Sequence, residues 1–363
     1  MSISQKILEK KYMKLAFEQA NKNIGSTKEN PSVGCVVVKN DSVISSGATS
    51  LNGRPHAETN ALKFKRNFIG SNIYVTLEPC THYGKTPPCV NQILRKGIKK
   101  VYYPISDPDV RTYNKARSFL KKNKINVKVG ILKKEALNFY KSYFISKQKK
   151  SLPFIDAKIA ISKDFFSVNL KNKWITNIAS RTKVHVLRSQ YDCILSTYKS
   201  VNKDNSLLNC RLEGMEKYSP SRVIIDKDLK LKKNLDIFNT TQKIPTYIIT
   251  NKKDKKKEIF LKSKKIRIIY IDGKHKQFEY KNILMELKKR GFSRILCESG
   301  LHTTKGLLKN KLIHNLFIFI SSSKLGKNGK NSFKNFLSNL RFRRKEKIKV
   351  NLSGDKLYKL SIK

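Results

Sequence analysis

Apolar residues recur at two different spacings along the first part of the chain. A spacing of three to four residues predicts amphipathic helices, and short apolar runs between polar residues predict buried strands. Two such runs enclose Lys39-Asn40-Asp41, whose residue types favour a hairpin turn. We expect helices over residues 4–22, 57–65, 88–96, 113–122 and 133–144, and strands over 33–38, 43–46, 73–77, 99–103 and 126–131. Strands alternating with helices predict a three-layer α/β domain.

A second pattern of the same kind follows a short polar and charged segment, Lys147 to Ser151. We therefore predict a first domain over residues 1–146, a linker over 147–152 and a second domain over 153–363. The lysine run 252–257 is expected to be a solvated loop. We expect strands over 154–161, 193–195, 222–226, 244–250, 266–271, 294–298 and 316–320, a helix opened by 174–176, and helices over 282–290 and 301–309.

Four residues of the first domain carry candidate chemistry. His56 and Glu58 lie two residues apart at an expected helix start, Cys80 follows an expected strand, and Cys89 lies at the next helix start. One imidazole and two thiolates fill three corners of a zinc tetrahedron and leave the fourth for water. Taken singly, each residue has an ordinary explanation, such as a helix cap, a buried thiol or a first-turn acid. Together they resemble the zinc deaminase pattern, which predicts one zinc ion per chain and Glu58 as the proton-moving catalytic group.

The composition is strongly basic, with 78 Lys and Arg residues against 26 Asp and Glu residues, a net charge of +52. Taken alone, such a charge favours a nucleic-acid or anionic-membrane partner. The lysines are spread along the whole chain, which favours solvated faces over one dedicated patch. We therefore expect no specific nucleic-acid partner.

The six cysteines show no spacing typical of a disulfide framework, and we expect reduced thiols. Residues 1–20 mix Glu and Lys without an unbroken apolar core, so we expect no signal peptide. No run approaches the roughly 18 apolar residues of a membrane span. These observations predict a soluble, cytoplasmic protein without a membrane partner.

The cysteine spacing indicates a particular family. Zinc deaminases usually carry Cys-x-x-Cys, whereas eight residues separate Cys80 from Cys89. Residues 76–89, with Asn30-Pro31-Ser32-Val33-Gly34 and Asp107-Pro108-Asp109, resemble the deaminase half of the bifunctional riboflavin-biosynthesis deaminase/reductase. The resemblance implies a cytidine-deaminase-like three-layer α/β/α fold and a diamino-hydroxy-phosphoribosylaminopyrimidine substrate. It also implies that Glu58 passes the proton of the attacking water to the departing ammonia.

The second domain resembles the reductase half of the same enzyme, which has a dihydrofolate-reductase-like α/β fold. Lys158-x-Ala160-x-Ser162-x-Asp164 opens it, and Ser200-Val201-x-x-Asp204-Asn205-x-x-Leu208-x-x-Arg211 follows. Glu298-Ser299-Gly300 lies between an expected strand and a helix, where dinucleotide phosphates meet free backbone amides. The resemblance implies NADPH as cofactor and hydride transfer to C1′ of the ribosyl group.

The same resemblance assigns residues to the second site. Taken singly, Trp174 would be a core residue, Arg188 and Arg211 surface residues, and Gly300 part of an ordinary tight turn. The implied cofactor-binding residues are Ala160, Trp174, Ser200, Asp204, Gly300, Leu301, His302, Thr303, Thr304, Lys305 and Gly306. The implied substrate-binding residues are Asn172, Arg188, Leu208, Arg211 and Glu298.

The chain departs from the family pattern at several positions. A glycine of the family is Phe165 here, and glycine at that point suggests a close backbone approach. An acidic pair of the family is His314-Asn315. The remaining departures are Ala48-Thr49 after Gly47, Asn172 before Trp174, Ser200 in place of Thr, and Asn205-Ser206 in place of Asp-Pro.

We therefore expect a two-step enzyme of flavin synthesis that deaminates the pyrimidine and then reduces its ribosyl group to ribityl, as a homo-oligomer, either dimer or tetramer. Two alternatives stay open. The net charge would suit a deaminase of bases in tRNA or another nucleic acid. Phe165 and His314 would suit a deaminase fused to a degenerate, merely structural reductase half.

Overall fold

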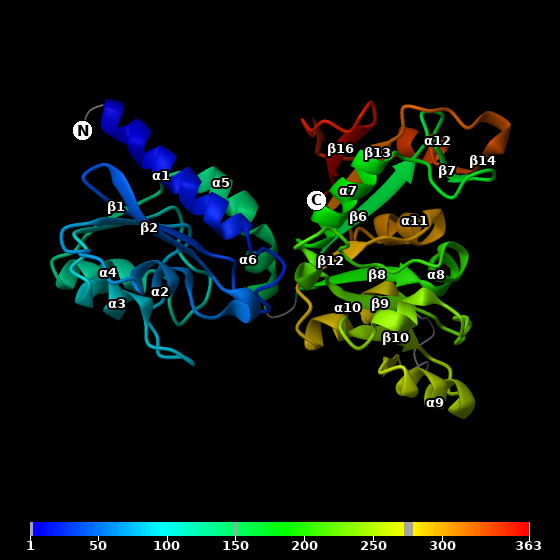
Figure 1. Ribbon diagram of the computed structural model, residues 1–363, viewed down its shortest axis with the longest axis horizontal. Helices are drawn as coiled ribbons and strands as arrows, with labels where there is room; N and C mark the ends of the chain where they lie inside the picture. The colour runs from blue at the N-terminus through cyan, green and yellow to red at the C-terminus, as the bar shows by residue number, and fades with distance from the viewer. Residues whose placement is uncertain (1–2, 149–150, 272–278, 363) are drawn as a thin grey trace. The chain divides into compact units, whose positions relative to one another are not determined.

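The chain folds into two compact units, Met1–Ser151 and Leu152–Lys363. The computed structural model describes residues 3–148, 151–271 and 279–362. Each unit has its own sheet and its own hydrophobic core (Figure 1). Lys147, the first residue of the expected linker, closes a helix, whereas Lys149 and Lys150 lie outside the described residues.

The first unit is built around a five-stranded sheet of order β2-β1-β3-β4-β5. Strand β1 is antiparallel to β2 and β3, and β3, β4 and β5 are parallel. The elements are α1 (Ile3–Asn21), β1 (Gly34–Lys39), β2 (Ser42–Ala48), η1 (Leu51–Gly53), α2 (Ala57–Leu62), β3 (Asn72–Val75), α3 (Cys89–Arg95), β4 (Lys100–Tyr103), α4 (Lys115–Lys122), β5 (Asn126–Val129), α5 (Lys133–Phe139) and α6 (Lys141–Lys147).

Alternating residues of these strands feed two cores, so the sheet is the middle of three layers. On one face, α2, α3 and α4 bury residues such as Ala61, Ile93 and Leu120 against the sheet. On the other face, Met13 of α1 packs against Val36 and its neighbours. The zinc-site residues lie where α2 and α3 begin, at one end of the first of these faces.

The second unit is built around a nine-stranded sheet of order β11-β10-β9-β8-β12-β6-β13-β16-β15. Its elements are β6 (Phe154–Ile161), β7 (Phe166–Asn169), α7 (Ile178–Arg188), β8 (Cys193–Thr197), α8 (Tyr198–Asp204), η2 (Glu216–Tyr218), β9 (Ser221–Ile225), η3 (Asp236–Thr240), β10 (Thr246–Thr250), α9 (Lys255–Ser263), β11 (Arg267–Tyr270), α10 (Tyr280–Lys289), β12 (Arg294–Cys297), α11 (Leu301–Lys309), β13 (Asn315–Ile320), η4 (Gly326–Asn328), β14 (Gly329–Ser332), α12 (Lys334–Ser338), β15 (Arg344–Lys347) and β16 (Lys356–Ser361).

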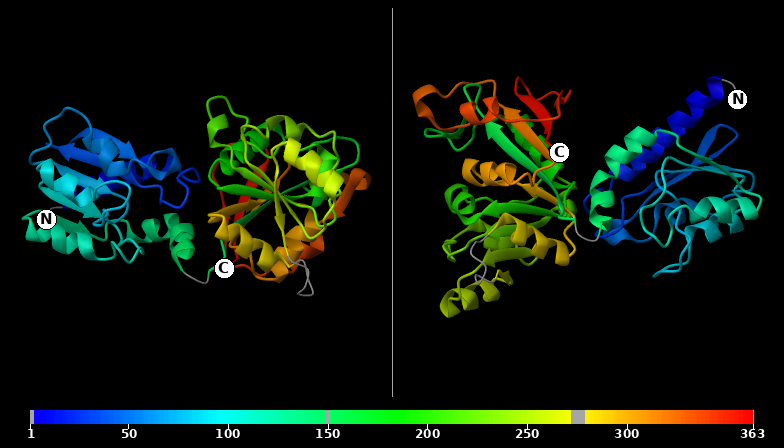
Figure 2. Two further views of the ribbon diagram at one scale, coloured as in Figure 1. Left: turned by 90° about the horizontal axis from the view of Figure 1, so that it is seen from below. Right: turned by 180° about the vertical axis from the view of Figure 1, so that it is seen from behind.

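Seven of these strands, from β11 to β13, run parallel, and β16 and β15 continue the sheet antiparallel. Helices α10 and α11 bury Leu284 and Leu307 on one face, whereas α7 and α9 bury Leu187 and Leu261 on the other. Figure 2 shows this two-sided cover from further directions. Because the strands are parallel, their carboxyl ends meet at one edge, where ligands of α/β sheets usually bind.

The structure corrects three details of the expected elements. Residues 133–144 are two helices that meet at Tyr140, not one. The lysine run 252–257 is not entirely a loop, because Lys255 begins α9 and the Asp254 side chain caps it by accepting from Lys257 N. Residues 174–176 precede α7 and do not open it, since Asn177 is its N-cap. The hairpin β15–β16 and the small β7–β14 sheet were not expected from the sequence.

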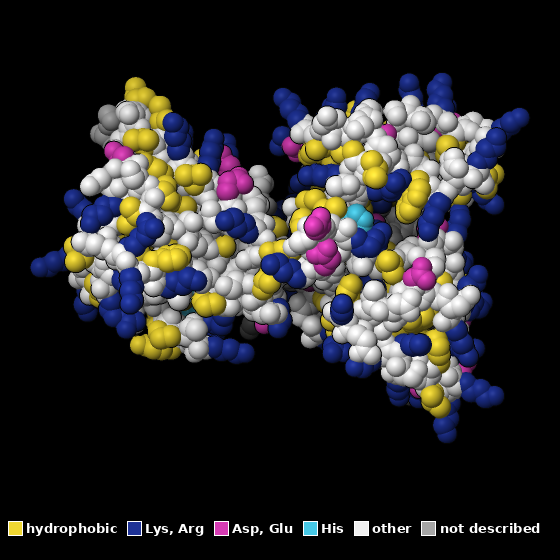
Figure 3. Space-filling view, viewed as in Figure 1, with side chains coloured by type: hydrophobic (Ala, Val, Ile, Leu, Met, Phe, Trp, Pro, Cys, Tyr) yellow, Lys and Arg dark blue, Asp and Glu magenta, His cyan; other side chains and the backbone are white. Residues whose placement is uncertain are grey.

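The basic charge is distributed over both units. Figure 3 shows Lys and Arg side chains spread across the visible face of each unit, with no single field of them. That distribution is typical of solvated lysines. Among the residues that the structure describes, no helix combines the length and the apolar character needed to cross a membrane.

Candidate active sites

The predicted zinc ligands converge in the first unit. His56 is the N-cap of α2, Cys80 follows β3, and Cys89 is the first residue of α3. The Nδ1 atom of His56 lies 3.6 Å from Sγ of Cys80 and 3.4 Å from Sγ of Cys89. The three donor atoms all lie within 4.8 Å of one another.

This spacing fits a zinc ion. Bond lengths of about 2.0 Å to nitrogen and 2.3 Å to sulfur, at a tetrahedral angle, separate the two donors by about 3.5 Å. The distances from the His56 imidazole to the two thiols match that separation. One imidazole and two thiols form a donor set that suits zinc and leaves one position for water or substrate.

Glu58 is the second residue of the same helix, in its first turn, and is 3% exposed. Burial raises the pKa of Glu58 to about 7, and the nearby Cys80 adds to the increase. A carboxyl group in this range can both accept and donate a proton near neutral pH. Its catalytic role stays a prediction.

Local packing fixes the position of both ligand segments. The backbone N–H of Cys89 donates to Sγ of Cys80 at 3.3 Å, which joins the two ends of the cysteine loop. A Cβ atom at Gly47 would lie 2.4 Å from the carbonyl oxygen of Ala57, so glycine lets α2 approach β2. Thr49, one of the departures from the family pattern, accepts a hydrogen bond from Val33 N and lines the pocket.

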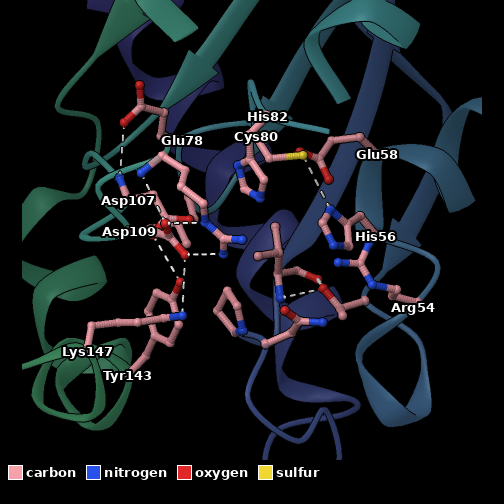
Figure 4. Close-up of a pocket in the computed structure, with 16 residues that line it drawn as sticks. Arg54, His56, Glu58, Glu78, Cys80, His82, Asp107, Asp109, Tyr143 and Lys147 are labelled. Carbon is pink, nitrogen blue, oxygen red and sulfur yellow. Dashed lines mark hydrogen bonds and ion pairs between the residues drawn. The ribbon is translucent and has the colours of Figure 1, made fainter. Parts of the chain in front are cut away.

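A pocket opens beside these residues, and the space outside the protein atoms there is about 540 Å³, part of it open to solvent. Figure 4 shows acidic and basic side chains on the wall opposite His56. Glu78 accepts hydrogen bonds from the backbone of Asp107, Asn114 and Ala116 and thereby fixes the loop that forms this wall. The lining residues are Asn30, Pro31, Val33, Thr49, Arg54, His56, Glu58, Leu77, Glu78, Cys80, His82, Asp107, Asp109, Arg111, Tyr143 and Lys147.

The sequence did not assign several of these wall residues to the site. Asn30 and Asp107 lie in the two segments that carried the family resemblance, so that signal was available. Tyr143 and Lys147 come from α6 and carried no signal. The Tyr143 hydroxyl donates to Asp107 at 3.0 Å, and Lys147 lies 3.4 Å from the Asp109 carboxylate.

In the second unit, a cluster of charged residues lies where β12 ends. Arg188, the last residue of α7, donates from Nε and Nη2 to the two oxygens of Glu298 at 2.6 and 3.0 Å. Lys158 on β6 lies 3.5 Å from the same carboxylate. Burial alone would raise the pKa of Glu298, but Arg188 and Lys158 outweigh it and hold the pKa at about 2. Lys158 was not among the predicted site residues.

The predicted cofactor residues lie in two groups at the carboxyl-terminal edge of the sheet. After β8, the Thr197 side chain caps α8 by accepting from Ser200 N, and Asp204 ends that helix. After β12, Gly300 is the N-cap of α11, and a Cβ atom there would meet nothing within 4 Å. The first turns of α11 contain Leu301, His302, Thr303, Thr304 and Lys305.

Some of these residues have packing roles. A Cβ atom at Gly306 would lie 2.6 Å from the Tyr280 ring, so this glycine lets α11 approach α10. Thr304 is fully buried and donates to the Ser299 carbonyl oxygen. Ala160 lies on β6, two residues beyond Lys158, and packs against the core under α7.

The predicted substrate residues other than Glu298 and Arg188 lie on loops. Leu208 is buried with a φ of 47°, and Arg211 donates to the Asn209 side chain at 2.5 Å. Asn172 is exposed. Trp174 is 52% exposed and therefore not a core residue, and the Arg181 guanidinium lies 4.6 Å from its ring centroid.

The two departures that favoured a degenerate reductase half have local structural explanations. Phe165 has a φ of 71°, a conformation that glycine adopts without strain, and its side chain packs against the main core of the unit. His314 and Asn315 lie at the amino end of β13, where His314 accepts from Ile155 N and Asn315 donates to Asp156. That end is opposite to the edge that carries Glu298 and Gly300.

Two family models match the chain. The RibD C-terminal domain matches residues 153–352, and the cytidine and deoxycytidylate deaminase zinc-binding region matches residues 6–105. With the site geometry, these matches define a zinc-binding deaminase domain followed by a reductase domain.

Proteins related to the chain cover most of its length. It is 36% identical over 324 residues to the riboflavin biosynthesis protein RibD of Aquifex aeolicus, which covers 88% of each chain. It is 32% identical over 323 residues to RibD of Bacillus amyloliquefaciens, covering 88% of this chain and 86% of that protein. The crystal structure of a diaminohydroxyphosphoribosylaminopyrimidine deaminase/5-amino-6-(5-phosphoribosylamino)uracil reductase from Thermotoga maritima matches with a TM-score of 0.83 and 29% identity over 99% of both chains.

The chain belongs to the RibD family of bifunctional riboflavin-biosynthesis enzymes. It is a deaminase and a reductase, with a zinc-binding deaminase domain and a pyrimidine substrate. The reductase domain implies a nucleotide cofactor. Because both halves match this family, the deaminase with a merely structural second half and the nucleic-acid base deaminase are set aside.

Proposed function

We propose that the chain deaminates 2,5-diamino-6-(5-phosphoribosylamino)pyrimidin-4(3H)-one and then reduces the ribosyl group of the product with NADPH. The observation that carries the first step is the convergence of His56, Cys80 and Cys89 beside the buried Glu58. The order of the two steps follows from the two activities of the related enzyme from Thermotoga maritima, because the uracil that is reduced is the deaminated form of the pyrimidine.

In the deaminase pocket, His56, Cys80 and Cys89 would hold one zinc ion. When bound, zinc supplies an activated water for attack on the ring carbon that carries the amine. Glu58 takes the proton of that water and delivers it to the departing ammonia. The same carboxyl group serves in both directions, since it takes up one proton and then gives it away.

In the reductase unit, we assign NADPH to the edge formed by the ends of β8 and β12. Backbone N–H donors support the assignment. The first-turn amides of α11 follow Gly300, where a side chain would meet open space. Helix α8 begins directly after β8, the strand next to β12. When bound, NADPH supplies the hydride. Ser200, Asp204 and Trp174 would contact the cofactor around this edge.

Lys158, Arg188 and Glu298 would form the polar floor beneath the ribosyl group. With a pKa of about 2, Glu298 stays ionised near neutral pH and can accept hydrogen bonds from sugar hydroxyls. The Arg188 fork is already engaged by Glu298, so we assign the phosphate contact to Arg211 and the adjoining contacts to Leu208 and Asn172.

We also propose a cytoplasmic homo-oligomer, either dimer or tetramer. The structure describes all six cysteines, and their lack of disulfide bonds favours a reducing compartment. Sedimentation of the purified protein tests the oligomeric state.

The decisive experiment is to incubate the zinc-loaded protein with the diaminopyrimidine, with and without NADPH, and to identify products by mass. Without NADPH, we expect a product one mass unit heavier, since an amine is replaced by an oxygen. With NADPH, we expect a further gain of two mass units. Absence of the first change contradicts the deaminase proposal, and absence of the second contradicts the cofactor assignment.

A further inference from the structure

Three Lys and Arg side chains line the deaminase pocket: Arg54, Arg111 and Lys147. They differ in whether a carboxylate neutralises their charge. Arg111 donates from Nε and Nη2 to the two oxygens of Asp109 at 2.8 and 2.6 Å. Lys147 lies 3.4 Å from the same carboxylate. Asp109 therefore neutralises part of the charge of both, and Arg111 lowers the pKa of Asp109 so that it stays ionised.

Arg54 has no such partner. Among the residues that the structure describes, no carboxylate forms an ion pair with it, although it is half-buried and lines the same pocket. Figure 4 shows its guanidinium beside His56 and directed into the pocket. Arg54 is thus the basic residue of the pocket with the least compensated charge.

Its position is fixed by the cysteine loop. Nη1 of Arg54 donates to Oγ1 of Thr86 at 2.6 Å, three residues before Cys89. A Cβ atom at Gly84 would lie 3.4 Å from Nη2, an ordinary contact distance, so the cysteine loop also borders this second nitrogen. One nitrogen therefore anchors the group while the others remain available to a ligand.

A planar guanidinium held at one nitrogen is suited to bind a phosphate through two parallel N–H donors. The substrate of the proposed deamination carries one phosphate, and a cation without a carboxylate partner on the wall of this pocket would favour it. We propose that Arg54 binds the phosphate of the phosphoribosyl group in the deaminase pocket. This assignment rests on the proposed function, because it takes the substrate from there.

The test compares the phosphorylated substrate with its dephosphorylated, ribosyl form in deamination assays of the full-length, zinc-loaded protein. Loss of a charge-assisted phosphate contact lowers kcat/KM by roughly tenfold to a hundredfold. We expect Arg54→Gln to show that loss with the phosphorylated form and almost none with the ribosyl form. Arg54→Lys, which keeps the charge but not the fork, should fall between. Zinc content should stay unchanged.

Arg95→Gln is the matched control, because it removes the same charge from α3 at a residue that does not line the pocket. We expect it to behave as wild type with both substrates. Ribose 5-phosphate should inhibit deamination competitively, and its inhibition constant should rise in Arg54→Gln to a similar extent.

Three results would overturn the proposal. An equal loss with both substrates means that Arg54 acts on the ring and not on the phosphate. A loss of zinc together with activity means that Arg54 only clamps the cysteine loop. Unchanged kinetics mean that it contacts no part of the substrate. If wild type deaminates neither form, the proposed function fails instead, and calorimetry with ribose 5-phosphate still decides whether Arg54→Gln removes a binding site.

Discussion

The two sites of this chain are built in opposite ways. The deaminase centre draws its three metal donors and Glu58 from 34 consecutive positions, residues 56–89, on elements that begin side by side. The reductase cluster draws Lys158, Arg188 and Glu298 from three elements that are up to 140 positions apart. The chemistry of the first site depends on a metal ion that the protein binds. The second site is a network of ion pairs in the interior of its unit.

The difference predicts different consequences of mutation. A change at the zinc centre should abolish chemistry and leave the fold, because none of the three ligands is a member of the core that α2, α3 and the sheet form. A change in the ion network should cost stability as well, because it leaves a buried charge without its partner.

The largest expected effect is that of Cys89→Ala. Two thiolates and one imidazole bind zinc tightly, and removal of one thiolate should reduce zinc from about one ion per chain to almost none. Deamination should be lost. Reduction of supplied deaminated intermediate should continue, since the reductase residues belong to the other unit. Elemental analysis and the two separate assays measure this, and a zinc-free variant that still deaminates would refute the metal site.

Glu58→Gln should have the next largest effect. The amide keeps the shape of the side chain but cannot take the proton, so deamination should fall by about 10²- to 10⁴-fold. Zinc content and the reductase rate should match wild type. Steady-state kinetics with zinc analysis separate this outcome from that of Cys89→Ala. Normal deamination by the variant would mean that another group moves the protons.

The same contrast explains what could be predicted from the sequence. His56 and Cys89 lie at expected helix starts and Cys80 follows an expected strand, all close together in the chain, and the structure brings them together as the pattern predicted. Tyr143 and Lys147 form the opposite pocket wall, but they lie more than 50 residues beyond Cys89 and carry no motif. Their place depends on how α6 packs, which periodicity does not determine.

The division of residues 133–144 into two helices was missed for a similar reason. Apolar spacing continues through both helices, so the pattern predicted one. Helix α5 ends at Tyr140, whose hydroxyl lies 2.5 Å from the Thr76 hydroxyl and donates to the Ser32 carbonyl. These partners lie far away in sequence. In the second unit, Glu298 was assigned only through the family resemblance, and its pairing with Arg188 and Lys158 emerged from tertiary structure.

Glu298→Gln tests whether the ion network of Lys158, Arg188 and Glu298 stabilises the second unit, as the comparison of the two sites predicts. The change leaves two half-buried cations without their carboxylate, and we expect the unfolding free energy of this unit to fall by about 3 kcal/mol at neutral pH. Urea titration followed by fluorescence measures it, since Trp174 is the single tryptophan of the chain. Glu286→Gln, which removes an exposed pair with Arg290, is the control and should change stability by less than about 1 kcal/mol.

The pH dependence of the unfolding free energy provides a second test with the same variant. The pKa of Glu298 is lowered from its ordinary 4.5 to about 2 in the folded state. Its stabilisation is therefore present above pH 4.5 and is lost as the pH falls toward 2, because the unfolded state takes up the proton first. Wild type should lose stability in this window more steeply than Glu298→Gln. Equal slopes would mean that Glu298 is not held ionised by its partners.

The smallest expected effect, and the most direct test of the Phe165 departure, is that of Phe165→Gly. A φ of 71° costs a residue with a Cβ atom about 1–2 kcal/mol, which glycine recovers. The half-buried ring packs against the main core, and its removal costs a comparable amount. The two terms oppose each other, so the unfolding free energy should change by no more than about 1 kcal/mol.

The backbone contacts at this position do not involve the side chain. Phe165 N donates to the Ser162 carbonyl at 3.0 Å, and its own carbonyl accepts from Phe333 N at 2.8 Å. Glycine would keep both bonds, so NADPH affinity measured by fluorescence titration should stay within about twofold of wild type. Phe165→Ala is the matched control, because it loses the ring but keeps the strain, and it should be about 1 kcal/mol less stable than Phe165→Gly. A tenfold gain in NADPH affinity in Phe165→Gly but not in Phe165→Ala would show that the unusual backbone at this turn, not the ring, weakens the cofactor site. A gain in both would show that the ring obstructs it.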